Sequence, residues 1–252
     1  MSSLGISFGV FDVLLFVVVS VQATVVAYLK DPESKAFMLT LPIPFTVAVL
    51  AVGQPVNTFN VAALVLLLIF TNAVRILHYT FKISIIAAIV SSAFIYCLLS
   101  ISLTKLIPST YKTFWPACLI TGTIAAFVYL KTPHRIELAY SSGLPIFLKL
   151  PFIMCIVFIL ICMKQFLMGF VTLFPMVGVF AAYEARFSLW TVCKQIPIVM
   201  ITILAMLIAC YLAQPGFGIA GSLIIGWIVF LVVLALQHIV RGGRDSTVKM
   251  TG

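Results

Sequence analysis

Two short proline-containing segments, far apart in the 252-residue chain, are the strongest candidates for a binding site. One is Thr40-Leu41-Pro42-Ile43-Pro44 and the other is Thr172-Leu173-Phe174-Pro175. Proline has no amide hydrogen and clashes with the carbonyl one turn earlier, so it opens the helical hydrogen-bond ladder. A backbone opened within lipid must be satisfied by other protein groups or by a water-lined cavity. The alternative is that each proline lies in the first turn of its helix, where it breaks nothing.

Two acidic residues lie close enough to apolar segments to act within a membrane. Asp12 lies near the start of the first segment, and Glu184 lies at the end of a later one, close to Arg186. A lone charge in lipid is costly, so a carboxylate found there is a functional candidate by default. Glu184 is therefore a candidate for binding a coupling proton or cation. The alternative for both acids is a position among lipid headgroups and water.

No group of residues matches an enzyme centre or a metal site. The chain has no nucleotide-binding loop, no H-E-x-x-H motif and no G-x-S-x-G motif. Its three histidines, His78, His134 and His238, lie far apart, and none of its six cysteines belongs to a C-x-x-C pair. We therefore expect no enzymatic activity, no cofactor and no metal ion, and we interpret the cysteines as small packing residues.

The composition indicates that lipid surrounds most of the chain. Hydrophobic residues make up 63% of the sequence and charged residues only 8%, against about 45–50% and about 25% in an ordinary soluble domain. A soluble fold of this length needs far more polar side chains on its surface. The net charge of +9 does not indicate a nucleic-acid partner, because the basic residues are scattered between apolar runs without a recognisable motif.

The elements that must position these residues are membrane-spanning helices. Such a helix needs about 20 predominantly apolar residues, and about 17 suffice. The connections between the candidate segments are short and no linker divides the chain, which predicts a single all-α transmembrane domain over residues 1–252. Nine segments qualify, at about 9–29, 37–53, 59–77, 83–104, 114–130, 146–163, 166–183, 191–212 and 217–240.

The lysines and arginines predict an orientation, because cytoplasmic loops carry an excess of these residues. With the N-terminus outside and nine spans, only Lys105, Lys112 and Lys164 fall on the outer side. The C-terminus is then cytoplasmic, and we expect a multi-pass protein of the plasma membrane, which in a bacterium is the inner membrane. The twelve remaining basic residues fall on the cytoplasmic side: Lys30, Lys35, Arg75, Lys82, Lys131, Arg135, Lys149, Arg186, Lys194, Arg241, Arg244 and Lys249.

An internal repeat links the two proline segments. Residues 36–44 read like residues 169–175, and residues 59–61 fall in register with residues 190–192, at an offset of about 131. The repeat predicts one half over about 9–105, a linker helix at about 114–130 and a second half over about 146–240. Four helices plus a linker place the second half upside down relative to the first, an arrangement typical of secondary transporters. The alternative is a chance similarity between apolar helices.

The second half also resembles a known family. Residues 170–183, Phe-Val-Thr-Leu-Phe-Pro-Met-Val-Gly-Val-Phe-Ala-Ala-Tyr, are similar to a segment of the GlpM-type small bacterial inner-membrane proteins, and the likeness extends from Gly169 to Gln237. Those proteins are about half as long, so the resemblance implies two such units fused in opposite orientations. It implies a role in the cell envelope and no site residues. The second proline of the first segment, Pro44, departs from the family pattern.

Together these features predict a multi-pass transporter of a small or amphipathic, lipid-like solute that works in the lipid bilayer. The alternative is an accessory or assembly subunit of an envelope-biosynthesis complex, which would require a membrane protein partner; a homo-oligomer is also compatible with the sequence. The predicted substrate-binding residues are Thr40, Pro42, Pro44, Thr46, Thr172, Pro175, Glu184 and Arg186.

Overall fold

The described part of the chain is helical throughout. The computed structural model describes residues 9–29, 31–132 and 168–250, with a few positions between 150 and 158. No strand occurs among these residues, which confirms the all-α class. The segment expected at 146–163 lies almost wholly outside the described residues. The elements are α1 (Val10–Tyr28), α2 (Pro32–Thr40), α3 (Ile43–Val52), α4 (Thr58–Tyr79), α5 (Ile85–Leu106), α6 (Tyr111–Lys131), the 3-10 helix η1 (Met168–Leu173), α9 (Met176–Glu184) and α10 (Leu189–Met250).

Five helices are long and apolar enough to cross a membrane: α1, α4, α5, α6 and residues 189–237 of α10. Their outward faces carry large apolar side chains. On α5, for example, Ile86, Val90, Phe94 and Leu98 recur every four residues and are all exposed. A continuous stripe of this kind would be unstable in water and is the normal surface of a helix in lipid. These helices indicate a membrane protein.

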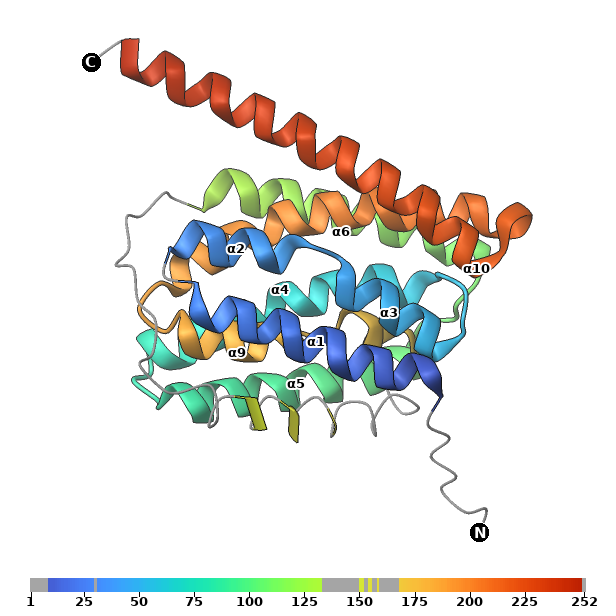
Figure 1. Cartoon of the computed structure of the whole chain (residues 1–252), viewed down its shortest axis with the longest axis horizontal. Helices are drawn as coiled ribbons and strands as arrows, with labels where there is room; N and C mark the ends of the chain where they lie inside the picture. Colours follow the sequence, from blue (N-terminus) through green and yellow to red (C-terminus); the bar gives the residue numbers. More distant parts are fainter. Residues whose placement is uncertain are drawn as a thin grey trace.

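The last helix, α10, reverses its direction at Gly218. A straight helix over residues 189–237 would be roughly 70 Å long, more than twice the hydrocarbon thickness of a bilayer. Gly218 instead takes a left-handed backbone conformation with φ of 65°, which glycine adopts without steric cost. Figure 1 shows the first arm running to one end of the molecule and the second arm returning. The segments expected at 191–212 and 217–240 fall on these two arms.

Both proline segments interrupt a helix. The segment expected at 37–53 divides into α2 and α3, because Leu41 is extended with ψ of 122° and Pro42 precedes the first turn of α3. The segment expected at 166–183 divides into η1 and α9, with Pro175 (φ −72°, ψ 55°) in the corresponding place. In each segment the proline starts the second piece, where its missing amide hydrogen removes no bond from that piece.

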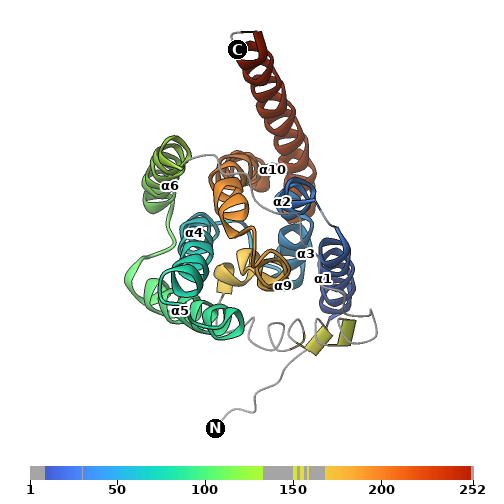
Figure 2. The same cartoon turned by 90° about the vertical axis from the view of Figure 1, so that its left-hand side faces the viewer.

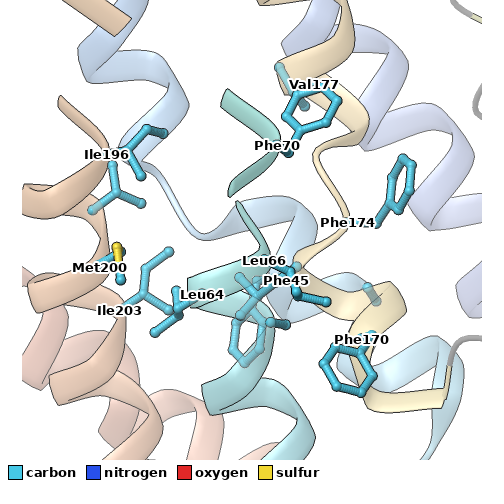
Figure 3. Packing of buried hydrophobic residues seen from close by; sticks show 14 of the residues in the cluster. Phe45, Leu64, Leu66, Phe70, Phe170, Phe174, Val177, Ile196, Met200 and Ile203 are labelled. Carbon is cyan, nitrogen blue, oxygen red and sulfur yellow. The ribbon is translucent and has the colours of Figure 1, made fainter. Parts of the chain in front are cut away.

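The core forms where these broken segments meet α4 and the first arm of α10. The helix α4 packs against α5, α6, α10 and η1, while α1 packs against α3 and α9. Figure 2 shows η1 and α9 near the centre of the bundle, between α1, α3, α4 and α5. In Figure 3, Phe45 of α3 and Leu64 of α4 lie close to Ile203 of α10, and Phe70 of α4 faces Val177 of α9.

Substitution of two glycines tests whether the two arms of α10, before and after Gly218, pack closely against each other. A Cβ atom at Gly226 would overlap Cys210 Sγ and lie 3.1 Å from Met206 Cγ, whereas a Cβ at Gly216 meets nothing within 4 Å. Replacing a helical glycine by alanine normally stabilises by up to about 1 kcal/mol. We expect Gly226→Ala to destabilise by about 1–3 kcal/mol instead, because the arms must separate. Gly216→Ala is the control and should be neutral or stabilising.

The measurement is the thermal unfolding midpoint of both variants in the same detergent. Equal midpoints for Gly226→Ala and Gly216→Ala would show that the two arms do not pack closely at Gly226.

Candidate functional site

A cavity of about 90 Å³ lies between the two helix breaks. Both links contribute to its wall, with Leu41 and Pro42 from the first and Phe174 and Pro175 from the second. Residues of α1, α4 and the first arm of α10 complete it. None of the lining residues carries a charge. The cavity is therefore an uncharged and largely apolar site within the bundle.

The two broken segments run in opposite directions beside each other. The first piece of one segment contacts the second piece of the other: α2 packs against α9, and α3 packs against η1. Consequently the two links meet near the middle of the bundle, at the cavity. Irregular backbone at this depth is tolerated where protein surrounds it or where it lines a cavity, and both conditions hold here.

The first break is satisfied by a side chain of α1. In an unbroken helix the amide of residue 42 would donate to the carbonyl of Met38, but Pro42 has no amide hydrogen. Gln22 Nε2 donates to Met38 O instead, at 2.8 Å. On the other side of the break, Thr46 Oγ1 donates to Pro42 O at 2.8 Å and accepts from Trp227 Nε1 at 2.9 Å. The first link is thus held from α1 and from the second arm of α10.

The second break is satisfied by α4 and α5. Asn60 Nδ2 donates to Gly169 O at 3.2 Å and to Thr172 Oγ1 at 2.8 Å, and Thr172 Oγ1 donates to Gly169 O at 2.7 Å. The hydroxyl of Tyr96 on α5 donates to Phe170 O at 3.0 Å. All five residues are buried. These bonds replace the backbone pairing that the short 3-10 helix leaves unmade.

Asn60 is oriented by the start of its own helix. Its Oδ1 accepts a hydrogen bond from the amide of Asn57 at 2.8 Å, and Asn57 Oδ1 accepts from the amide of Phe59 at 2.9 Å. This reciprocal capping box fixes the amide group of Asn60. Its NH₂ group is therefore directed at η1, where it donates to two acceptors. The ring of Phe59 adds a contact with Phe170, with centroids 5.5 Å apart.

The predicted acidic site lies at the end of α9 and beside the cavity, whose wall includes Ala182 and Leu189 on either side of it in the chain. Glu184 is buried at the end of α9, and Arg186 is half-buried just beyond it. Arg186 Nη1 donates to Tyr183 O at 3.1 Å, and its guanidinium carbon lies 4.8 Å from the centre of the Tyr183 ring. The hydroxyl of Tyr79 on α4 donates to Arg186 O at 3.1 Å. Neither Glu184 nor Arg186 lines the cavity.

The structure divides the eight predicted site residues into three groups. Pro42, Pro44, Thr172 and Pro175 line the cavity, and Glu184 and Arg186 lie at the end of α9. Thr40 and Thr46 lie at the first break without lining the cavity: Thr40 Oγ1 donates to Phe37 O at 2.6 Å.

The other acid considered from the sequence, Asp12, caps the start of α1. Its Oδ2 accepts a hydrogen bond from the amide of Gly9 at 2.8 Å. A carboxylate is favourable at this position, because the amide hydrogens at a helix N-terminus have no partner within the helix. This cap accounts for Asp12 without a role in binding.

The sequence analysis does not identify three residues whose side chains support the helix breaks: Gln22, Asn60 and Tyr96. Gln22 has a visible signal, because it is the one amide side chain in the middle of the first apolar segment. Asn60 and Tyr96 have none, because each matters through a carbonyl more than 70 residues away.

Comparison with known proteins yields no relative: no family model, no curated protein and no solved structure matches the chain. The resemblance to GlpM-type proteins therefore stays a prediction.

The role of Asn60 is testable by substitution with leucine, which has a similar volume. We expect Asn60→Leu to destabilise the protein by about 1–3 kcal/mol, because Gly169 O and the amide of Asn57 each lose a buried partner. Asn72→Leu is the matched control, since among the described residues Asn72 Nδ2 donates to Leu68 O of its own helix, at 2.9 Å, and to no other group. That single bond should contribute about 0.6 kcal/mol or less.

Denaturation of both variants in mixed micelles measures the difference. A cost for Asn72→Leu equal to that for Asn60→Leu would contradict the view that Asn60 supports the second break.

Proposed function

We propose that the chain is a small transporter and that the cavity between the two helix breaks is its substrate site. The observation that carries this proposal is the meeting of two broken, oppositely directed membrane segments at one cavity. Secondary transporters use such discontinuous helices to expose backbone dipoles to a solute near the bilayer midplane. The absence of charged lining residues suits an uncharged or amphipathic solute.

The order of the elements supports an inverted repeat. Thr58 and Leu189, which begin α4 and α10, are 131 residues apart, and Pro42 and Pro175, which precede α3 and α9, are 133 residues apart. The series α2–α3, α4 and α5 thus has the same order as η1–α9 and the two arms of α10, with α6 between the two series. We propose that the counterpart of α1 is the segment at 146–163, which lies outside the described residues. The halves would then be related by a two-fold axis in the membrane plane.

The two ends of the bundle differ in charge. One end holds the side-chain pair Thr58 and Thr113, whose Oγ1 atoms lie 3.1 Å apart, and near them the termini of helices that carry Lys105 and Lys112. The opposite end holds the Tyr79 contact with Arg186 and a larger number of bases. Among the described residues these bases are Arg75, Lys82, Lys131, Arg186 and Lys194. The backbones of Lys35 in α2 and of Arg241, Arg244 and Lys249 in the last turns of α10 lie at the same end.

From this difference we propose an orientation and a location. The base-rich end faces the cytoplasm, as the positive-inside rule favours. The N-terminus then lies outside and the C-terminus lies in the cytoplasm of a bacterial cell, with the chain in its inner membrane.

Reporter fusions after Gly252 test the orientation. A reporter that works only in the cytoplasm should be active, and one that requires export should be inactive. A fusion after Ser109, between α5 and α6, should show the reverse pattern. Export of the reporter after Gly252 would invalidate both the orientation and the odd number of spans on which the inverted repeat depends.

Cysteine accessibility tests transport itself. In a variant lacking the six native cysteines, Ile196→Cys places a thiol in the wall of the cavity. Ile198→Cys is the control, because Ile198 is equally buried on the same helix but does not line the cavity. Alternating access predicts that a membrane-impermeant thiol reagent modifies position 196 from opposite sides as ion gradients are reversed. Position 198 should stay protected throughout.

A fixed pattern at position 196 under all gradients, together with a partner that co-purifies in constant ratio, would contradict transport. That result would instead identify an accessory subunit of a membrane complex.

A further inference from the structure

The side-chain amide of Gln22 makes a hydrogen bond through its nitrogen, whereas its oxygen has no partner among the described residues. The side chain is only 5% exposed and lines the cavity. Its Nε2 donates to Met38 O at 2.8 Å, and because that acceptor is a carbonyl, it identifies which end of the amide carries the hydrogens. Gln22 Oε1 therefore lies on the other side. Within the described part of the chain this oxygen is buried and accepts no hydrogen bond.

A buried carbonyl oxygen without a donor is costly, and native proteins rarely leave one unless a ligand or water satisfies it. The backbone bond prevents Gln22 from turning away, since rotation of the amide would leave Met38 O unsatisfied. Because Gln22 lines the cavity, a hydrogen-bond donor that enters the cavity can satisfy this oxygen.

The walls define the rest of the ligand. The lining side chains beside Gln22 include Leu39, Phe45, Val74 and Ile196, and none of the lining residues is charged. A charged ligand would lose its hydration without gaining a counter-charge. The cavity of about 90 Å³ exceeds the roughly 10–15 Å³ that one water molecule requires. It has room for a small organic group.

We propose that this cavity binds an uncharged solute that has a hydroxyl group on a small apolar body, with the hydroxyl donating to Gln22 Oε1. The proposal rests on the assignment of the cavity as the substrate site, and it defines the chemical class of the substrate. Gln22 is then a specificity residue. Its Nε2 donates to the carbonyl of Met38 at the first helix break, and its Oε1 accepts a hydrogen bond from the solute.

The test uses two fluorinated probes of nearly equal shape, 2,2,2-trifluoroethanol and 1,1,1-trifluoropropane, which differ by a hydroxyl in place of a methyl group. Fluorine NMR titrations measure binding of each probe to the full-length protein in lipid nanodiscs, and empty nanodiscs correct for partition into lipid. We expect the alcohol to bind saturably and at least about tenfold more tightly than the hydrocarbon, as one additional hydrogen bond in a dry site predicts.

Two leucine substitutions locate the effect. Gln22→Leu should reduce the preference for the alcohol to less than about twofold, because the acceptor is gone. Gln214→Leu is the control: Gln214 Nε2 also donates to a backbone carbonyl, Val56 O at 3.1 Å, and its Oε1 also lacks a described partner, yet it does not line the cavity. This variant should keep the full preference.

Equal binding of both probes to the wild-type protein would overturn the proposal, and this comparison needs no variant that folds. A full preference in Gln22→Leu would overturn it as well. If the labelling of Ile196→Cys still alternates with the gradient, such a result rejects the substrate class and leaves transport intact. Selective binding of the alcohol with fixed labelling would support the site and reject transport.

Discussion

Backbone carbonyls that lose their helical partners within lipid are the constraint on which this structure depends. Water cannot reach them, and each unsatisfied group costs several kcal/mol. Pro42 and the short helix η1 free carbonyls at two places, and the side chains of Gln22, Asn60 and Tyr96 satisfy them. The three donors come from α1, α4 and α5. These helices must therefore lie around the breaks, and the arrangement of the bundle follows from that requirement.

The same constraint explains why the cavity lies where it does. Both links leave the helical conformation, at Leu41 with ψ of 122° and at Pro175 with ψ of 55°, and both contribute to the cavity wall. The capping box of Asn57 and Asn60 links one break to the start of α4. The side-chain amide of Asn60 accepts from the backbone at the start of α4 with its oxygen and donates to η1 with its nitrogen. Buried apolar side chains such as Phe45 and Phe174 form most of the rest of the cavity wall.

The sequence predicts the local features well and the distant ones poorly. Apolar length predicts the helices α1, α4, α5 and α6 to within a few residues, since lipid imposes the same requirement everywhere along a span. The prolines predict the places of both breaks, and four of the eight predicted site residues line the cavity. Gln22 and Asn60 act on carbonyls 16 and 109 residues away, and no local pattern encodes that pairing. Glu184 is conspicuous as an acid, but its position in the chain does not show that its side chain stays outside the cavity wall.

The distance along the chain between Asn60 and its acceptors has a consequence for biosynthesis. Gly169 and Thr172 follow Asn60 by 109 and 112 residues, which a ribosome adds in about 5–20 seconds. Throughout that interval α4 is already made, but Gly169 and Thr172, the acceptors of the side-chain amide of Asn60, have not yet been added to the chain. The first half is thus an incomplete product that must be held by the insertion machinery, or wait at the membrane surface, until η1 arrives. Assembly of this protein therefore depends on a segment made long after α4, and a chain that ends after α6 would leave the side-chain amide of Asn60 without these two acceptors.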